Sequence, residues 1–139
     1  MSFLPFTVPW ADALRAAIED DADYRSAAAK WTWPVAMVLE PAAEFGYPEA
    51  VAIELALDRG RCAHAEVRDP STVTAPFVLR ATYATWKSIV RGELDVMSAV
   101  VHRKVTVRGS LTTLMMHTRA AIALVACAQR VPTEFPDER

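Results

Sequence analysis

The chain has 139 residues, close to the usual size of a single domain, and carries a formal net charge of −2 with a pI near 5.9. Hydrophobic residues make up 53% of the sequence and charged residues 23%, which excludes a disordered chain and leaves no basic footprint for nucleic acid. The longest apolar run, residues 120–128, is far shorter than the ~20 residues of a membrane-spanning helix, so no such helix is expected.

Cysteine usage and the first residues bear on the compartment. Only Cys62 and Cys127 are present, too few for a disulfide framework, and the N-terminus lacks the basic and long apolar regions of a secretory signal. A cytoplasmic protein with two reduced thiols is the simplest interpretation. We expect one domain over residues 1–139, with an N-terminal helical region at 1–32, a core fold at 33–131 and a short tail at 132–139.

The N-terminal region is predicted to form two helices. Apolar residues at helical spacing indicate a helix over residues 10–19, and Pro9 suits its entry. The acidic cluster at residues 20–23 supplies capping carboxylates for a second, shorter helix over residues 24–30.

From residue 33 the hydrophobic period changes from helical to alternating. Strands are predicted over residues 33–39, 51–58, 62–68, 77–83 and 104–108. In the third of these, His64, Glu66 and Arg68 face one way while alanine and valine side chains face the other. We therefore expect one face of the sheet to be exposed to solvent and the other to be buried under helices.

Two helices are predicted between the fourth and fifth strands. Thr82 can cap the first, which Gly92 would end at its C′ position, and Asp95 can cap the second. Ser110 then caps a final helix of about twenty residues that Pro132 ends.

This final helix is apolar almost all round, so it must be covered on more than one side. The excess of apolar residues on this helix fits an ordinary core, a dimer interface or an apolar pocket. The flexible methionines Met97, Met115 and Met116 are typical of an adaptable pocket.

The sequence offers little support for catalysis or metal binding. It contains no G-x-S-x-G, P-loop or Rossmann glycine pattern. The best metal candidate is Cys62 and His64 with Glu66, but on a strand Cys62 and Glu66 stand ~13 Å apart, too far to share one zinc ion. His117 could act as a general base, although a partly buried structural histidine fits its apolar helix better. No catalytic residue, metal or cofactor is expected.

Three stretches resemble the sterol carrier protein type 2 family, in its stand-alone bacterial form. They are residues 79–86 (LRATYATW), residues 92–95 (GELD), similar to the family's G-[KE]-L-D turn, and residues 104–109 (KVTVRG), similar to its K-[LVI]-x-[VI]-x-G strand. Their order and spacing fit within residues 77–131, and the upstream strands have a similar layout. The C-terminus lacks the Ser-Lys-Leu peroxisomal address of many eukaryotic members.

The resemblance implies an α/β (α+β) fold: a five-stranded, largely antiparallel mixed sheet with helices packed on one face, enclosing an apolar cavity. It implies non-enzymatic binding and intracellular transfer of a hydrophobic small molecule, such as a fatty acyl, sterol-like or other lipid. Carried onto matching positions, the ligand-binding residues would be Leu79, Trp86, Ile89, Leu94, Met97, Val101, Leu111, Met115 and Ile122.

Two other functions stay open. The protein could be an interaction module whose final helix mediates dimerisation or docking. It could also be a cone-type α+β enzyme that uses Glu54 or Asp58 as an acid, although the strand alternation turns both carboxylates outward. For a carrier, Arg80 or Arg119 is the candidate that would hold a ligand carboxylate. A homodimer and a transient contact with a membrane or an enzyme also stay open.

Overall fold

Alternating apolar residues form one five-stranded sheet in the computed structural model, which describes residues 1–138. The strands are β1 (Val35–Leu39), β2 (Val51–Asp58), β3 (Arg61–Arg68), β4 (Phe77–Ala81) and β5 (Thr106–Arg108). Their order is β3-β2-β1-β4-β5, and only the central pair β1–β4 is parallel. The predicted largely antiparallel mixed sheet is confirmed. β1 begins two residues later than predicted, directly after Pro34, which has no N–H for the ladder.

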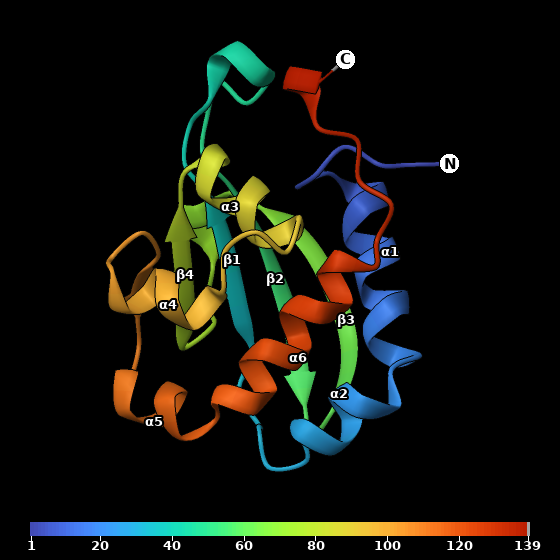
Figure 1. Cartoon of the computed structure of the whole chain (residues 1–139), viewed down its shortest axis with the longest axis vertical. Helices are drawn as coiled ribbons and strands as arrows, with labels where there is room; N and C mark the ends of the chain where they lie inside the picture. Colours follow the sequence, from blue (N-terminus) through green and yellow to red (C-terminus); the bar gives the residue numbers. More distant parts are fainter. Residues whose placement is uncertain (139) are drawn as a thin grey trace.

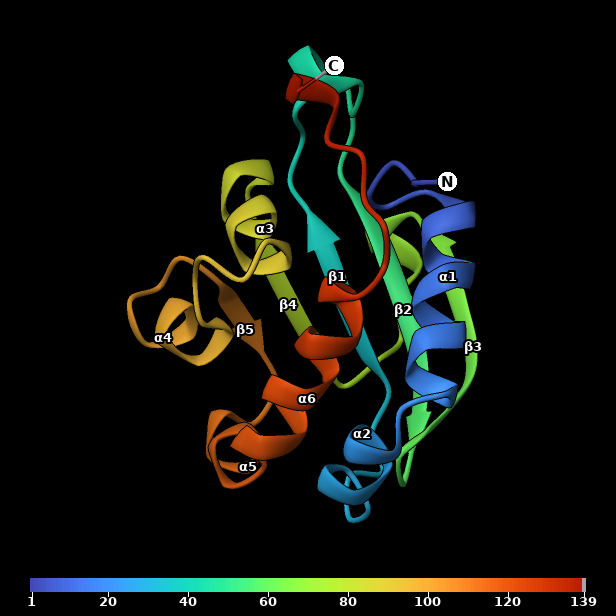
Figure 2. The ribbon, with the colours of Figure 1, turned by 45° about the vertical axis from the view of Figure 1, so that its right-hand side comes forward.

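Six α-helices cover one face of this sheet (Figures 1 and 2). They are α1 (Val8–Glu19), α2 (Ala22–Ala27), α3 (Tyr83–Val90), α4 (Val96–Val101), α5 (Leu111–Met116) and α6 (Thr118–Gln129). In Figure 1, α6 runs diagonally in front of the sheet and α1 lies along β3. Within residues 1–138, no helix has the length and apolar character needed to cross a bilayer.

Side-chain caps set the starts of the short helices. Thr82 accepts a hydrogen bond from the Thr85 N–H at 3.2 Å, and Asp95 accepts one from the Ser98 N–H at 2.9 Å. Gly92 has φ +76°, the left-handed conformation that ends a helix. The predicted caps of α3 and α4 and the glycine stop between them are therefore confirmed.

The prediction of one final helix of about twenty residues is wrong, because the chain leaves the helical path at His117 (φ −116°, ψ 34°). The Thr118 hydroxyl donates to the Met115 carbonyl at 2.8 Å, and so occupies an acceptor that a continuous helix would offer to the next turn. The His117 ring packs edge-on against Trp31, with ring centroids 5.3 Å apart. Helix α5 thus ends and α6 starts in a new direction.

The two faces of the sheet differ as predicted. The face toward the helices is packed into a core that runs from Phe6 to Phe135. The outer face carries ion pairs, such as Arg68 with Glu54 at 3.0 Å and Arg80 with Glu40 at 3.7 Å. Successive strand residues point to opposite faces, which separates the two environments, and in the central strand β1 the outward residues Ala36 and Val38 are buried as well.

Candidate functional site

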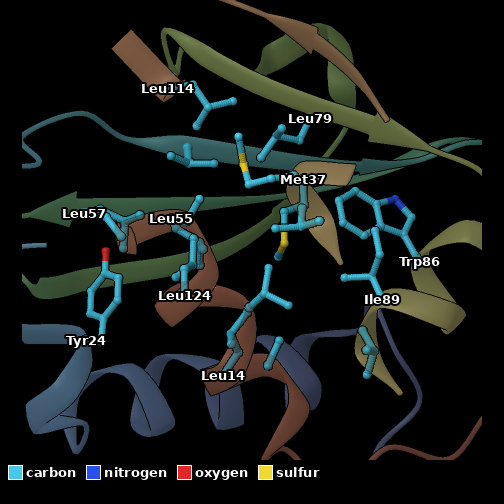
Figure 3. A pocket seen from close by; sticks show the side chains of 18 of the residues that line it. Leu14, Tyr24, Met37, Leu55, Leu57, Leu79, Trp86, Ile89, Leu114 and Leu124 are labelled. Atoms are coloured by element: carbon cyan, nitrogen blue, oxygen red, sulfur yellow. The ribbon is translucent and has the colours of Figure 1, made fainter. Parts of the chain in front are cut away.

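An apolar cavity lies between the sheet and the helical layer, with a volume of about 60 Å³ (Figure 3). Its floor is made by inward-facing strand residues, namely Val35, Met37, Leu55, Leu57 and Leu79. Val35 is paired with Leu55, and Met37 with Leu79, so these side chains stand side by side across three strands.

The helices supply the rest of the wall. Each of the six helices contributes, and the main side chains are Trp10, Leu14, Tyr24, Trp86, Ile89, Val90, Val96, Met97, Val100, Leu114, Ala121, Leu124 and Val125. On α6, Ala121, Leu124 and Val125 recur at helical spacing, so one side of this helix faces the cavity, and all three residues are half-buried.

The wall is apolar because its indole N–H groups are bonded within the protein. Trp86 donates to the Val38 carbonyl at 2.9 Å, and Trp31 donates to the Trp33 carbonyl at 2.7 Å. Trp10 donates to the Thr133 hydroxyl at 3.0 Å. Among the residues that the structure describes, no Asp, Glu, Lys, Arg or His lines the cavity. The cavity can therefore hold hydrocarbon, and in the part of the chain that the structure describes its wall carries no carboxylate, imidazole or cationic side chain.

The sequence-predicted site residues fall into two groups. Leu79, Trp86, Ile89 and Met97 lie in the cavity wall. Outside the wall lie half-buried Leu94 and the exposed side chains of Val101, Leu111, Met115 and Ile122.

The helix break explains much of this second group. The prediction placed Leu111, Met115 and Ile122 on one continuous helix, but the chain turns at His117, and of the α5 residues only Leu114 reaches the cavity. A ligand contact at any of the predicted residues stays a prediction.

Two sets of wall residues are absent from the predicted site. The alternation in residues 51–58 could have located part of the floor, because it separates Leu55 and Leu57 from the acidic Glu54 and Asp58. No local pattern placed Tyr24 or Leu124 in the wall, since their positions depend on how α2 and α6 pack.

The charged candidates lie away from the cavity. Arg80 is on the outer face of the sheet with Glu40, and Arg119 is exposed beside a shallow groove between α2 and α6. Glu54 accepts hydrogen bonds from the backbone N–H groups of Thr74 and Ala75, at 2.9 and 2.7 Å. None of these groups can contact a molecule inside the cavity as the chain is folded here.

The C-terminal tail is bonded to α3, which carries three wall residues, Trp86, Ile89 and Val90. The Tyr83 hydroxyl donates to Asp137 at 2.6 Å, and the Lys87 ammonium pairs with Asp137 at 2.6 Å and with Glu138 at 2.9 Å. The Lys87 ammonium also lies 5.6 Å from the centre of the Phe135 ring. Arg139, the last residue of the predicted tail, is outside the described residues.

A five-stranded sheet with one helical layer around an apolar cavity defines an α+β sandwich with an apolar interior. Residues 12–121 match the SCP-2 sterol transfer family. A crystal structure of sterol carrier protein 2 superimposes with a TM-score of 0.87 at 31% identity, over 91% of this chain and 98% of that one. A possible sterol carrier protein from Thermus thermophilus gives a TM-score of 0.87 at 30% identity, over 96% of this chain and 94% of that one.

The chain therefore belongs to the SCP-2 sterol transfer family. The fold extends to a more distant structure, the apo form of sterol carrier protein 2 from Yarrowia lipolytica, at 16% identity and a TM-score of 0.57 over 86% of this chain and 89% of that one. A comparison with curated protein sequences gave no match.

Proposed function

We propose that this protein is a non-enzymatic carrier that binds one hydrophobic small molecule in the cavity and transfers it inside the cell. The observation that carries this proposal is a cavity wall made of aliphatic and aromatic side chains with every indole N–H bonded to the protein. Such a wall favours hydrocarbon, because each buried CH₂ group contributes about 0.8 kcal/mol. Family membership supports the same function.

The cavity must widen to hold such a ligand. Its volume of about 60 Å³ is well below the ~150 Å³ at which an apolar cavity binds benzene. The flexible side chains of Met37 and Met97 can move without loss of apolar contact. The α4 and α5 helices have six residues each, and short helices open at a lower free energy than the core of a sheet. We infer that the ligand enters beside these helices.

Transfer requires contact with a donor or acceptor, and one surface suits an anionic bilayer. We call it the α4–α6 face and define it by the exposed apolar residues Val101, Leu111, Met115, Met116 and Ile122 and the exposed cations Arg103, Lys104, Arg108 and Arg119. Helices α4 and α5 both lie beside α6 (Figures 1 and 2).

Charge complementarity supports an anionic bilayer as the partner of this face. Residues 96–133 contain five Lys or Arg and no Asp or Glu, although the whole chain has a net charge of −2. No ion pair joins the four cations of the α4–α6 face to any of residues 1–138, whereas Arg61, Arg68 and Arg130 are paired. Unpaired cations beside exposed apolar side chains are the features by which a surface binds anionic lipid.

We place the carrier in the cytoplasm, where thiols stay reduced. The two cysteines support this compartment, since Cys62 and Cys127 are both free and buried. Burial raises the pKa of the Cys62 thiol to about 11 and that of Cys127 to about 12, so both are unreactive structural thiols.

A neutral environment-sensitive dye, Nile red, tests the carrier function. The purified protein should bind about one dye molecule per chain with increased fluorescence, and an unlabelled long-chain lipid should displace it. Circular dichroism on the same sample checks that the domain is folded. A folded protein that leaves the dye dark at micromolar concentration contradicts the proposed function.

A further inference from the structure

Tyr24 brings a hydroxyl group to a cavity wall that is otherwise hydrocarbon or internally bonded. Its side chain is 1% exposed and belongs to the wall. The residue sits near the start of α2, where its backbone N–H donates to the Asp21 carboxylate at 2.8 Å. Figure 3 shows the ring reaching up from α2 with its oxygen toward Leu57 of β2, at the opposite end of the cavity from Trp86.

This hydroxyl differs from the other tyrosine hydroxyls in having no protein partner. The Tyr47 hydroxyl donates to the Pro5 carbonyl at 2.5 Å, and the Tyr83 hydroxyl donates to Asp137 at 2.6 Å. Within residues 1–138, no group forms a hydrogen bond with the Tyr24 hydroxyl, although the residue is buried. The fully enclosed side-chain atoms without a hydrogen-bond partner in residues 1–138 are Arg25 Nε and Arg68 Nε, so the Tyr24 oxygen borders free space although its residue is 1% exposed. A hydroxyl that borders an apolar cavity without a protein partner can take its partner from outside the chain.

We infer that the Tyr24 hydroxyl binds a neutral oxygen atom, a hydroxyl or carbonyl group, at the end of the hydrophobic ligand. The inference rests on the proposed carrier function and names its ligand class. Since three indoles in the wall are already bonded, Tyr24 is the side chain left to orient a ligand. The hydrocarbon part then extends from Tyr24 toward Trp86 along the cavity.

The surroundings of Tyr24 favour a neutral group over a carboxylate. Burial raises the pKa of the Tyr24 hydroxyl above its ordinary value, so the group stays a protonated donor. The neighbouring Cys62 and Cys127 thiols are engaged elsewhere, donating to the His64 carbonyl and to Asp21, both at 3.3 Å. With no cation in the wall, a ligand carboxylate would be buried unpaired at a high cost.

Three probes of equal chain length test this inference: 1-dodecanol, dodecane and dodecanoate. Affinities are measured at pH 8 by displacement of Nile red from the parent, from Tyr24→Phe and from the control Tyr83→Phe. We expect the parent to bind dodecanol more tightly than dodecanoate. Tyr24→Phe should weaken the affinity for dodecanol roughly tenfold, which corresponds to one lost hydrogen bond. The affinity of this variant for dodecane should equal that of the parent. Tyr83→Phe should retain the parent's affinities, because its hydroxyl lies outside the wall.

Thermal unfolding without ligand separates this role from a structural one. Tyr24→Phe removes an unpaired hydroxyl, so its Tm should equal or exceed that of the parent, while Tyr83→Phe should lower the Tm. Three results would overturn the inference without contradicting the carrier function. They are a clear fall in Tm for Tyr24→Phe, an equal loss of affinity for dodecanol and dodecane, and an unchanged affinity for dodecanol. If the folded parent binds none of the probes and no dye, the proposed function itself fails.

Discussion

Asp21, at the start of α2, and Arg130, just after α6, form an ion pair with an Oδ2 to Nη1 distance of 2.5 Å although 109 positions separate them. The same carboxylate accepts hydrogen bonds from the Cys127 thiol at 3.3 Å and, through Oδ1, from the Tyr24 N–H at 2.8 Å. These contacts fix α2 against α6 and so hold two walls of the cavity in place.

Stability should therefore depend on the ionised form of Asp21. The Tyr24 N–H and the Arg130 guanidinium lower the pKa of its carboxyl to about 2 from 3.8. Because the folded pKa is the lower one, the stabilisation is complete above about pH 4 and is lost as the pH falls toward 2. We expect Asp21→Asn to lower the free energy of unfolding by about 1–2 kcal/mol at pH 7, measured by urea titration.

The neighbouring exposed Asp20 supplies the control for this prediction. Asp20→Asn should leave the unfolding free energy at pH 7 nearly unchanged, because its side chain is exposed. The difference between the parent and Asp21→Asn should shrink between pH 4 and pH 2. A difference that is constant over this range contradicts the assigned role of the carboxylate.

Gly60 should tolerate substitution less well than Gly92, although both have positive φ, +83° and +76°. A Cβ atom at Gly60 would lie 2.6 Å from the Arg25 Cα of α2, while at Gly92 the nearest atom is a Gln129 side-chain nitrogen at 3.7 Å. We expect Gly60→Ala to cost at least ~2 kcal/mol and Gly92→Ala about 1 kcal/mol, measured as unfolding free energies. Equal costs would show that the β2–β3 turn does not set the position of α2.

The position of a tryptophan on α5 or α6 should decide whether it blocks the ligand. Leu124 lies in the cavity wall, whereas Met115 is exposed outside it. We expect Leu124→Trp to weaken Nile red binding more than tenfold by filling the cavity, with a cost in stability of at most ~1–3 kcal/mol. Met115→Trp should leave dye affinity and Tm close to those of the parent, and a loss of binding there would move the cavity boundary to α5.

Contact with anionic vesicles should depend on the α4–α6 face. Co-sedimentation with phosphatidylcholine vesicles that contain phosphatidylglycerol should exceed that with pure phosphatidylcholine and should fall as salt rises. Met116→Asp and Arg103→Glu should each reduce this binding. Val8→Asp is the matched control, because Val8 is also an exposed apolar residue, 59% against 78% for Met116, but lies on α1.

A second measurement tests whether the partner of the α4–α6 face is a bilayer or a second copy of the chain. Sedimentation velocity of the parent without vesicles should give a monomer at every concentration. A dimer that Met116→Asp dissociates, together with no vesicle binding by the parent, would assign the α4–α6 face to self-association instead.

The sequence by itself determined the features that depend on near neighbours. Alternation placed the strands and the inward side of the sheet, because successive strand residues point to opposite faces. The caps at Thr82 and Asp95 and the turn at Gly92 followed from local hydrogen bonding and backbone sterics. The motifs of residues 79–109 also predicted the family, and the match over residues 12–121 confirms it.

The tertiary structure decided which of these residues surround the cavity. The break at His117 turned Leu111 and Met115 away from the interior, and it depends partly on Trp31, a residue 86 positions earlier in the chain. Tyr24 entered the wall because α2 packs on α6 through Asp21. Helical periodicity states which side chains share a face, but only the packing of distant segments determines what that face contacts.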